Sequence, residues 1–121
     1  MNFRILFVLI SLAGSGCSEN ANVLSQKEIQ AIQLVFDAAE QTPDVLEKWS
    51  RSCALCHVNG EGGAPRMGDA SAWKPRIAKG NAQLMVNTVR GFNRMPPLGY
   101  CMDCEDNDFA AMIKMMAGID K

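Results

Sequence analysis

The residues best able to do chemistry stand together in the run Cys53-Ala54-Leu55-Cys56-His57. A C-x-x-C-H sequence is the attachment signature of c-type haem. On a helix, positions i, i+3 and i+4 share one face, so both thiols and the imidazole would point the same way. The thiols can then add to the two haem vinyl groups while the imidazole binds the iron. We therefore expect one covalently bound haem c, held by Cys53 and Cys56, with His57 as an axial ligand.

Helices must position this motif. The run Ser25-Gln26-Lys27-Glu28 has the pattern of a capping box, and it predicts a helix that ends near Gln41. Thr42-Pro43 predicts the start of a second helix, with Thr42 as N-cap and proline at the first position. The apolar side of this second helix is expected to run straight into the motif, through Val45, Leu46, Trp49, Cys53 and Cys56.

Loops and further helices follow the motif. Residues 59–69, which contain four glycines, predict a loop, and residues 92–98 predict a second one. Between them we expect a short helix over 71–79 and a longer helix over 82–90. A last helix over 106–117 has apolar residues at i, i+3, i+4 and i+7. The short helix is interrupted or begun at Pro75, Asn81 caps the longer one, and Gly91 ends it. No stretch alternates like a strand, so the fold class is all-α.

The N-terminus predicts export. Met1-Asn2-Phe3-Arg4 is short and basic, an apolar run extends from Ile5 to Ala13, and small residues continue to Gly16. Residues 1–16 thus have the layout of a secretory signal peptide, too short to span a bilayer. Cys17 leaves two alternatives open, namely lipidation, which would anchor the chain to a membrane, and simple release. In both cases we expect a periplasmic protein, with an extension over 17–42 and a haem domain over 43–121.

Charge and composition exclude several function classes. The 121-residue chain has 12 basic and 13 acidic residues, with no run of like charge. It therefore gives no sign of a nucleic-acid partner. The sequence shows no carboxylate pair, nucleophile–base pair or phosphate loop, so we do not expect an enzyme.

The five cysteines fall into three sets, which are Cys17, the motif pair, and Cys101 with Cys104. Free thiols rarely persist in an oxidising compartment. We therefore predict a disulfide between Cys101 and Cys104, which fixes the chain just after residue 95.

The chain has a single histidine, so the second axial ligand of the iron cannot be another histidine of this chain. A methionine is the first choice, and lysine or an external molecule are the alternatives. Met95 is the best candidate, because Pro96-Pro97 fixes two φ angles and stiffens its loop. Met1 belongs to the predicted signal peptide, and the other methionines fit core packing better or lie in loops less suited to reach the iron: Met67, Met85, Met102, Met112, Met115 and Met116.

These features resemble the class I c-type cytochromes, and most closely the cytochrome c5 family. The match covers about Asp44 to Ala117. Its elements are the haem motif, Gly63-Ala64-Pro65-Arg66-Met67-Gly68-Asp69, Trp73, Pro75-Arg76, Lys79-Gly80, Met95-Pro96-Pro97-Leu98-Gly99 and Cys101-Met102-Asp103-Cys104. The second C-x-x-C, just past the Met-Pro-Pro loop, separates this family from other small cytochromes c.

The resemblance implies a small class I cytochrome fold, with helices and loops wrapped around one haem. It implies an electron carrier with redox partner proteins, His57 and Met95 as axial ligands, and a Cys101–Cys104 disulfide. It also implies that the carbonyl of Pro65 accepts the imidazole N–H, which would fix the ring and raise its basicity. The helix predicted over 25–41 lies outside the match and has no assigned role.

Trp73 and Arg76 have two roles open. They could line the haem propionates, because buried carboxylates need donors. In the alternative, Trp73 is a core residue and Arg76 is solvated.

Three rival functions explain less of the sequence. A structural zinc site with four cysteine ligands would need the two C-x-x-C pairs to lie closer in sequence, and it leaves His57 unexplained. A thiol oxidoreductase would need the strands of a thioredoxin-like fold. A ligand-binding or peroxidatic cytochrome would need a distal acid or base.

Overall fold

The computed structural model describes residues 23–119, and within this range it contains helices and only one isolated β-bridge, between Phe92 and Met95. The predicted signal peptide and Cys17 lie outside the described residues. The predicted all-α class is confirmed. The helices, in chain order, are α1 (Gln26–Ala38), α2 (Pro43–Arg51), α3 (Ala54–His57), α4 (Ala70–Ile77), α5 (Asn81–Arg90) and α6 (Asp106–Ala117), with 3₁₀ helices at Glu61–Gly63 and Pro97–Tyr100.

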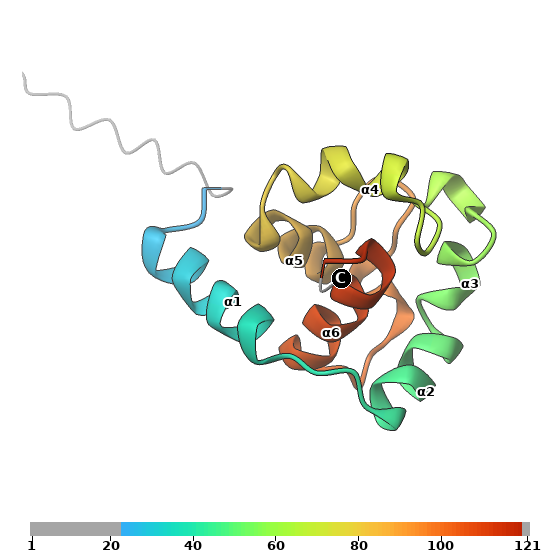
Figure 1. Ribbon diagram of the computed structural model, residues 1–121, viewed down its shortest axis with the longest axis horizontal. Helices are drawn as coiled ribbons and strands as arrows, with labels where there is room; N and C mark the ends of the chain where they lie inside the picture. Colours follow the sequence, from blue (N-terminus) through green and yellow to red (C-terminus); the bar gives the residue numbers. More distant parts are fainter. Residues whose placement is uncertain (1–22, 120–121) are drawn as a thin grey trace, which may run out of the picture.

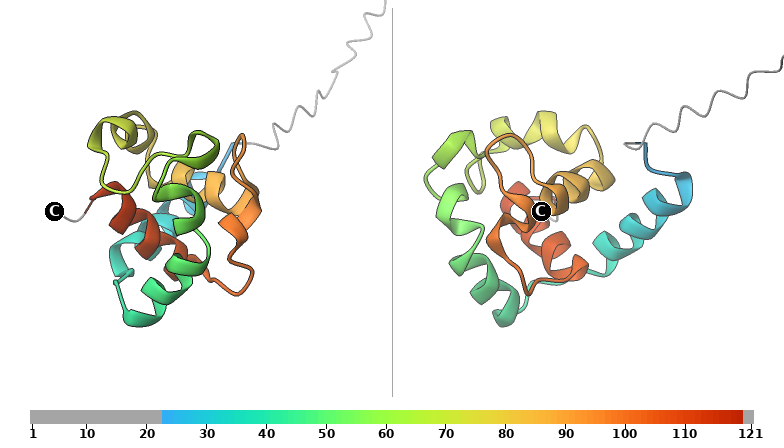
Figure 2. Two further views of the ribbon diagram at one scale, coloured as in Figure 1. Left: turned by 90° about the vertical axis from the view of Figure 1, so that its right-hand side faces the viewer. Right: turned by 180° about the vertical axis from the view of Figure 1, so that it is seen from behind.

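α6 is the helix around which the others are arranged, and it contacts α1, α2, α4 and α5 (Figure 1; Figure 2). Its bounds are those predicted from the sequence. Its apolar face is buried throughout, because all four residues of the predicted i, i+3, i+4, i+7 stripe are in the core, namely Phe109, Met112, Ile113 and Met116. The haem motif packs against this face of α6.

α1 begins at the predicted capping box. The amide of Glu28 donates to the Ser25 hydroxyl, and the amide of Ser25 donates to the Glu28 carboxylate. The helix ends at Ala38, three residues before the expected Gln41. The Lys114 ammonium of α6 donates to the carbonyl oxygens of Phe36 and Ala39, each 2.9 Å away. These bonds satisfy carbonyls that the end of a helix leaves without partners.

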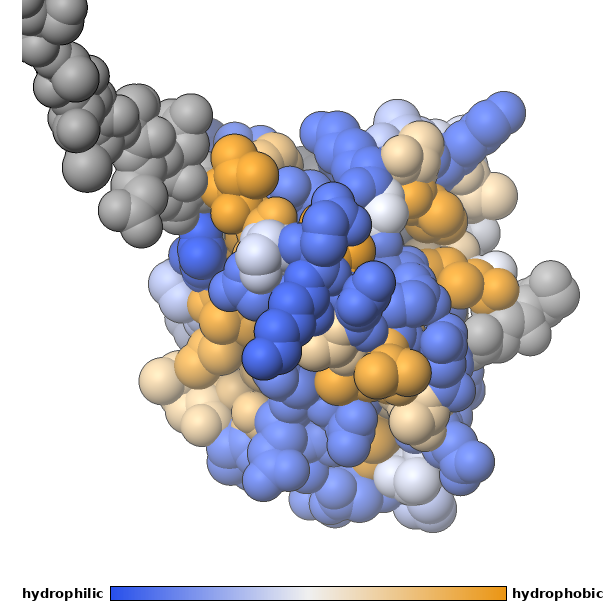
Figure 3. All heavy atoms as spheres, turned by 90° about the vertical axis from the view of Figure 1, so that its left-hand side faces the viewer, coloured by the Kyte–Doolittle hydropathy of each residue, from blue (hydrophilic) through white to orange (hydrophobic). Residues whose placement is uncertain are grey.

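α1 thus packs on α5 and α6 through Phe36, which is almost fully buried, and it is an integral part of the fold. On the side of the molecule that carries α1, exposed apolar residues are dispersed among hydrophilic ones (Figure 3).

The single helix expected from Thr42 through the motif is wrong. α2 starts as predicted, with Thr42 as N-cap, but it ends at Arg51, and the chain bends at Ser52 (φ −130°, ψ −88°) before α3 begins. The Ser52 hydroxyl donates to the Lys48 carbonyl oxygen at 2.6 Å, and such bonds to the carbonyl four residues earlier often bend helices. The bend separates the apolar face of α2 from that of the motif, and Leu46, expected on the buried side, is 52% exposed.

α4 and α5 differ from the prediction at their bounds. α4 begins at Ala70, capped by Asp69, continues through Pro75, which lies on an exposed part of the helix, and ends at Ile77, two residues before the expected Lys79. Asn81 does not cap α5 but is its first residue. Gly80 takes the N-cap position with φ +87° and ψ 158°, a backbone conformation that glycine adopts readily. The helix therefore starts one residue earlier than predicted.

Candidate haem-binding site

The motif residues converge on one cavity. In α3, the amides of Cys56 and His57 both donate to the carbonyl oxygen of Cys53, which gives the helical turn the motif requires. The thiols of Cys53 and Cys56 are not joined to each other, and both line the cavity together with His57. Burial raises the pKa of Cys53. Its sulfur lies 3.5 Å from that of Met112, so the motif packs directly on α6.

The His57 ring is buried and oriented from one side. Its Nδ1 atom lies 2.7 Å from the carbonyl oxygen of Pro65, which accepts the ring N–H. This leaves Nε2 as the atom able to bind a metal. Burial lowers the pKa of His57, the Pro65 carbonyl opposes that shift, and the charge of Arg76 adds to it. The ring is therefore held neutral at neutral pH, which is the form that ligates iron.

Met95 lines the same cavity as His57. Its loop is closed by two backbone hydrogen bonds with Phe92, of 3.0 Å and 2.9 Å. Gly99, whose φ is +54°, faces the side chain. A Cβ atom there would lie 3.4 Å from the Met95 methyl carbon and 3.8 Å from the sulfur of Cys53. The missing side chain keeps space open between the thioether and the attachment cysteine.

The other methionines are placed less favourably for ligation. Met67 and Met102 are exposed, whereas Met85 and Met112 are buried in the core and do not line the cavity. Met116 does line the cavity, from α6, although the sequence pattern assigns it only to the core. Met95 and Met116 are thus the two methionines that the structure brings to the cavity.

Trp73 and Arg76, on α4, also line the cavity. The Trp73 indole is buried, and its N–H donates to the Arg66 carbonyl oxygen at 2.8 Å. Arg76 is half-buried and donates to the carbonyl oxygen of Ala72. The lining also contains Lys79 and Gly99, which the resemblance includes without a role, and a further cationic residue that the sequence does not indicate, Arg94.

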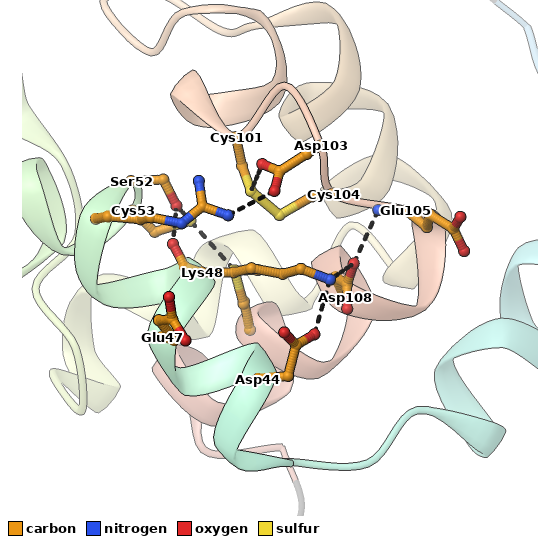
Figure 4. The surroundings of a disulfide bond; sticks show 12 residues. Asp44, Glu47, Lys48, Ser52, Cys53, Cys101, Asp103, Cys104, Glu105 and Asp108 are labelled. Carbon is orange, nitrogen blue, oxygen red and sulfur yellow. Dashed lines mark hydrogen bonds and ion pairs between the residues drawn. A yellow bond between two sulfur atoms is a disulfide. The ribbon is translucent and has the colours of Figure 1, made fainter.

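A disulfide between Cys101 and Cys104 follows the Met95 loop (Figure 4). Cys101 is fully buried, and Asp103, inside the small ring, pairs with Arg51 at 2.7 Å. The bonded sulfurs are not available as thiolates, so the two C-x-x-C pairs do not form a zinc site with four cysteine ligands.

A second ion pair fixes the same end of α2. The Lys48 ammonium lies between two carboxylates, 2.8 Å from Asp44 and 3.0 Å from Asp108 at the start of α6 (Figure 4). The helix that leads into the haem motif is thereby tied to both the disulfide loop and α6.

These residues fit a haem c. Two unpaired thiols could form its thioether links, a neutral imidazole and a thioether face one cavity, and apolar side chains such as Leu84 and Ile113 supply an apolar lining. Such a site, in an all-α fold wrapped around the cavity, defines a class I c-type cytochrome.

Comparison with known proteins supports the assignment to the class I c-type cytochromes. The family model described as "Cytochrome C oxidase, cbb3-type, subunit III" matches residues 40–116. Cytochrome c5 of Azotobacter vinelandii is 41% identical over 83 residues, which cover 67% of this chain and 96% of that protein. The chain therefore belongs to the cytochrome c5 family of class I c-type cytochromes.

Two solved structures are similar in fold. A mono-haem ferrocytochrome c from Shewanella putrefaciens has a TM-score of 0.57 and 38% identity, covering 64% of this chain and 95% of its own. A cytochrome c in an electron-transfer complex with nitrite reductase has a TM-score of 0.59 and 27% identity, covering 68% and 100%. The protein is thus a monohaem electron carrier with one covalently bound haem c. α1 lies wholly before the residues that match the family model.

Proposed function

We propose that this cytochrome passes single electrons between periplasmic redox proteins, with Cys53 and Cys56 holding the haem and His57 and Met95 as its two axial ligands. The observation that carries this proposal is the placing of one imidazole and one stiffly held thioether on the same cavity. The haem supplies a centre that takes up and releases one electron. His57 and Met95 would hold the iron from its two sides, and such a centre would have no position open to a substrate.

The protein's own residues hold that centre constant. The Pro65 carbonyl fixes the tautomer and orientation of His57. The two hydrogen bonds between Phe92 and Met95 fix the loop on the other side. Ligands held this firmly change position little between oxidation states, and this favours rapid electron transfer. His/Met ligation also raises the reduction potential relative to bis-histidine ligation.

Catalysis is not part of the proposed function. The side chains that most often serve as general acid or base are histidine and the carboxylates. Glu61 is the one carboxylate residue among those that line the cavity in the described part of the chain, and its side chain is exposed. This supports a carrier and argues against a peroxidatic enzyme.

We propose export to the periplasm from the signal-peptide pattern of residues 1–16, with residues 17–42 as an extension that contains α1 and residues 43–121 as the cytochrome domain. Lipid attachment at Cys17 and simple release both remain compatible with this arrangement. Residues 23–119 contain no helix long and apolar enough to cross a bilayer.

The similar cytochrome solved with nitrite reductase supports a partner that is itself a redox protein. We propose that the partner docks where the cavity opens and that the cationic residues of its lining, Arg76, Lys79 and Arg94, favour an acidic docking surface on that partner.

A potentiometric titration followed by visible absorption tests the proposed function. The protein should titrate in one reversible one-electron step, and carbon monoxide should not bind the reduced form within minutes. Rapid binding of carbon monoxide to the reduced protein would mean that an axial position is open, and the carrier proposal would fail.

A further inference from the structure

We infer that Trp73 is a positioning residue for the axial imidazole, fixing His57 both directly and through the segment that carries Pro65. This role differs from propionate binding and from simple core packing, and it rests on the proposed ligation of iron by His57.

The direct contact is a stack of two rings. The centroids of the His57 imidazole and the Trp73 indole are 5.9 Å apart, with an angle of 21° between the ring planes. Offset stacks have centroid separations of about 4.5–7 Å and favour one relative orientation of the rings. Both side chains are almost fully buried, at 6% and 3% exposure, so neither ring can swing into solvent. The indole thus limits rotation of the imidazole about its Cβ–Cγ bond.

The indirect contact runs through the backbone. The Trp73 indole N–H donates to the carbonyl oxygen of Arg66, the residue next to Pro65. The Pro65 carbonyl in turn accepts the His57 N–H at 2.7 Å. The buried Trp73 side chain therefore stacks on the face of the imidazole and also bonds the peptide segment whose Pro65 carbonyl accepts the imidazole N–H. Orientation by such an outer layer of contacts is what tunes a ligated metal.

The chain contains a matched control for this role. It has two tryptophans, and the indole nitrogen of the other, Trp49, is buried and has no hydrogen-bond partner in the structure. Trp73→Phe keeps an aromatic ring but removes an N–H that donates a hydrogen bond. Trp49→Phe removes an N–H that makes no hydrogen bond. The two substitutions delete the same atoms, so a difference between them reports the bond to Arg66.

The experiment measures solvent exchange of the His57 Nδ1–H by NMR in the reduced protein. A net hydrogen bond contributes about 0.5–1.5 kcal/mol, so releasing the Pro65 segment should speed exchange by about two- to thirteenfold in Trp73→Phe. Trp49→Phe should exchange at the wild-type rate. An increase of less than about twofold in Trp73→Phe, or an equal increase in both variants, would overturn the inference about the backbone contact.

The stack is tested separately, through the pattern of haem-methyl shifts in the oxidised protein, which depends on the orientation of the axial ligand planes. Trp73→Leu should change this pattern, and Trp73→Phe should largely restore it. An unchanged pattern in Trp73→Leu would overturn the stacking role. If the leucine variant does not fold, the exchange rate in the phenylalanine variant still decides the inference. A wild-type protein with no iron-bound histidine signal would instead refute the proposed ligation itself.

Discussion

A Cβ atom on Gly91 would lie 2.8 Å from the carbonyl oxygen of Met95 and 3.0 Å from the nitrogen of Pro97. The end of α5 therefore passes directly against the loop that presents Met95. Both neighbours are backbone atoms, which cannot move aside as a flexible side chain could. Gly91 has φ +82°, so it also supplies a backbone conformation that other residues rarely adopt.

Gly91→Ala should loosen the Met95 loop. Gly80→Ala is a close control, because Gly80 has nearly the same backbone angles (φ +87°, ψ 158°, against φ +82°, ψ 157°) and nothing within 4 Å of its Cβ position. Both variants should lose about 1–2 kcal/mol of stability from the backbone conformation. Only Gly91→Ala should also weaken the hold of the loop on Met95, so imidazole added to the protein should displace Met95 more easily. If this loosening costs about 1.4 kcal/mol, the affinity for imidazole in an absorption titration rises about tenfold. Equal imidazole affinities would show that the close approach does not hold the ligand.

Met95→Ala should abolish the weak near-infrared band of methionine-to-ferric charge transfer and lower the reduction potential, because a thioether ligand favours the reduced iron. Met116→Leu is the control, since Met116 is the other methionine that lines the cavity and the substitution nearly conserves volume, at a cost below about 1.5 kcal/mol. Near-infrared absorption of the oxidised proteins distinguishes them. A band that survives in Met95→Ala and vanishes in Met116→Leu would assign the ligand to α6.

Replacing Cys101 and Cys104 together by serine should lower stability without changing the haem spectrum at room temperature. The bridge joins residues only three apart, so its loop-closure contribution is about 2 kcal/mol. For a domain of this size, that corresponds to a fall in melting temperature of roughly 10 °C. Thermal unfolding followed by circular dichroism measures the loss. A structural bridge is refuted if the native pair titrates as a separate two-electron couple near the working potential.

Acid should weaken the contact between α2 and α6. Burial acts to raise the pKa of Asp108, but the hydrogen bond from the Glu105 amide and the contact with Lys48 outweigh it and hold the pKa below the usual value of about 3.8. A lowered folded-state pKa contributes stability that is present above the usual pKa and is lost as the pH falls through the lowered one. The free energy of unfolding should therefore fall below about pH 4 more steeply in the wild type than in Asp108→Asn. Parallel curves would contradict this account.

The parts of the fold that follow from local spacing could be predicted from the sequence. The stripe of α6, the capping box at Ser25 and the start of α2 at Thr42 depend on residues within one or two helical turns, and the structure has each of them. The arrangement of the haem motif is also local, because one turn of helix is enough to align its two thiols and its imidazole.

The parts that depend on distant or backbone partners could not be predicted. The bend at Ser52 is accompanied by a bond from its hydroxyl to the Lys48 carbonyl, but a serine can make the same bond without leaving a helix, so the residue type does not predict the bend. The partners of Trp73 are a ring sixteen residues earlier and a main-chain carbonyl, and no side-chain pattern encodes the position of a carbonyl. Lys79 and Arg94 join the cavity only because the loops fold over it.

Covalent haem attachment is tested most directly by the mass of the peptide that contains residues 53–57, cut from the native protein after acid–acetone extraction. We expect this peptide to carry the mass of one haem, linked through Cys53 and Cys56, with neither thiol available for labelling. Haem that is lost in the extraction, with both thiols free to react, would contradict it.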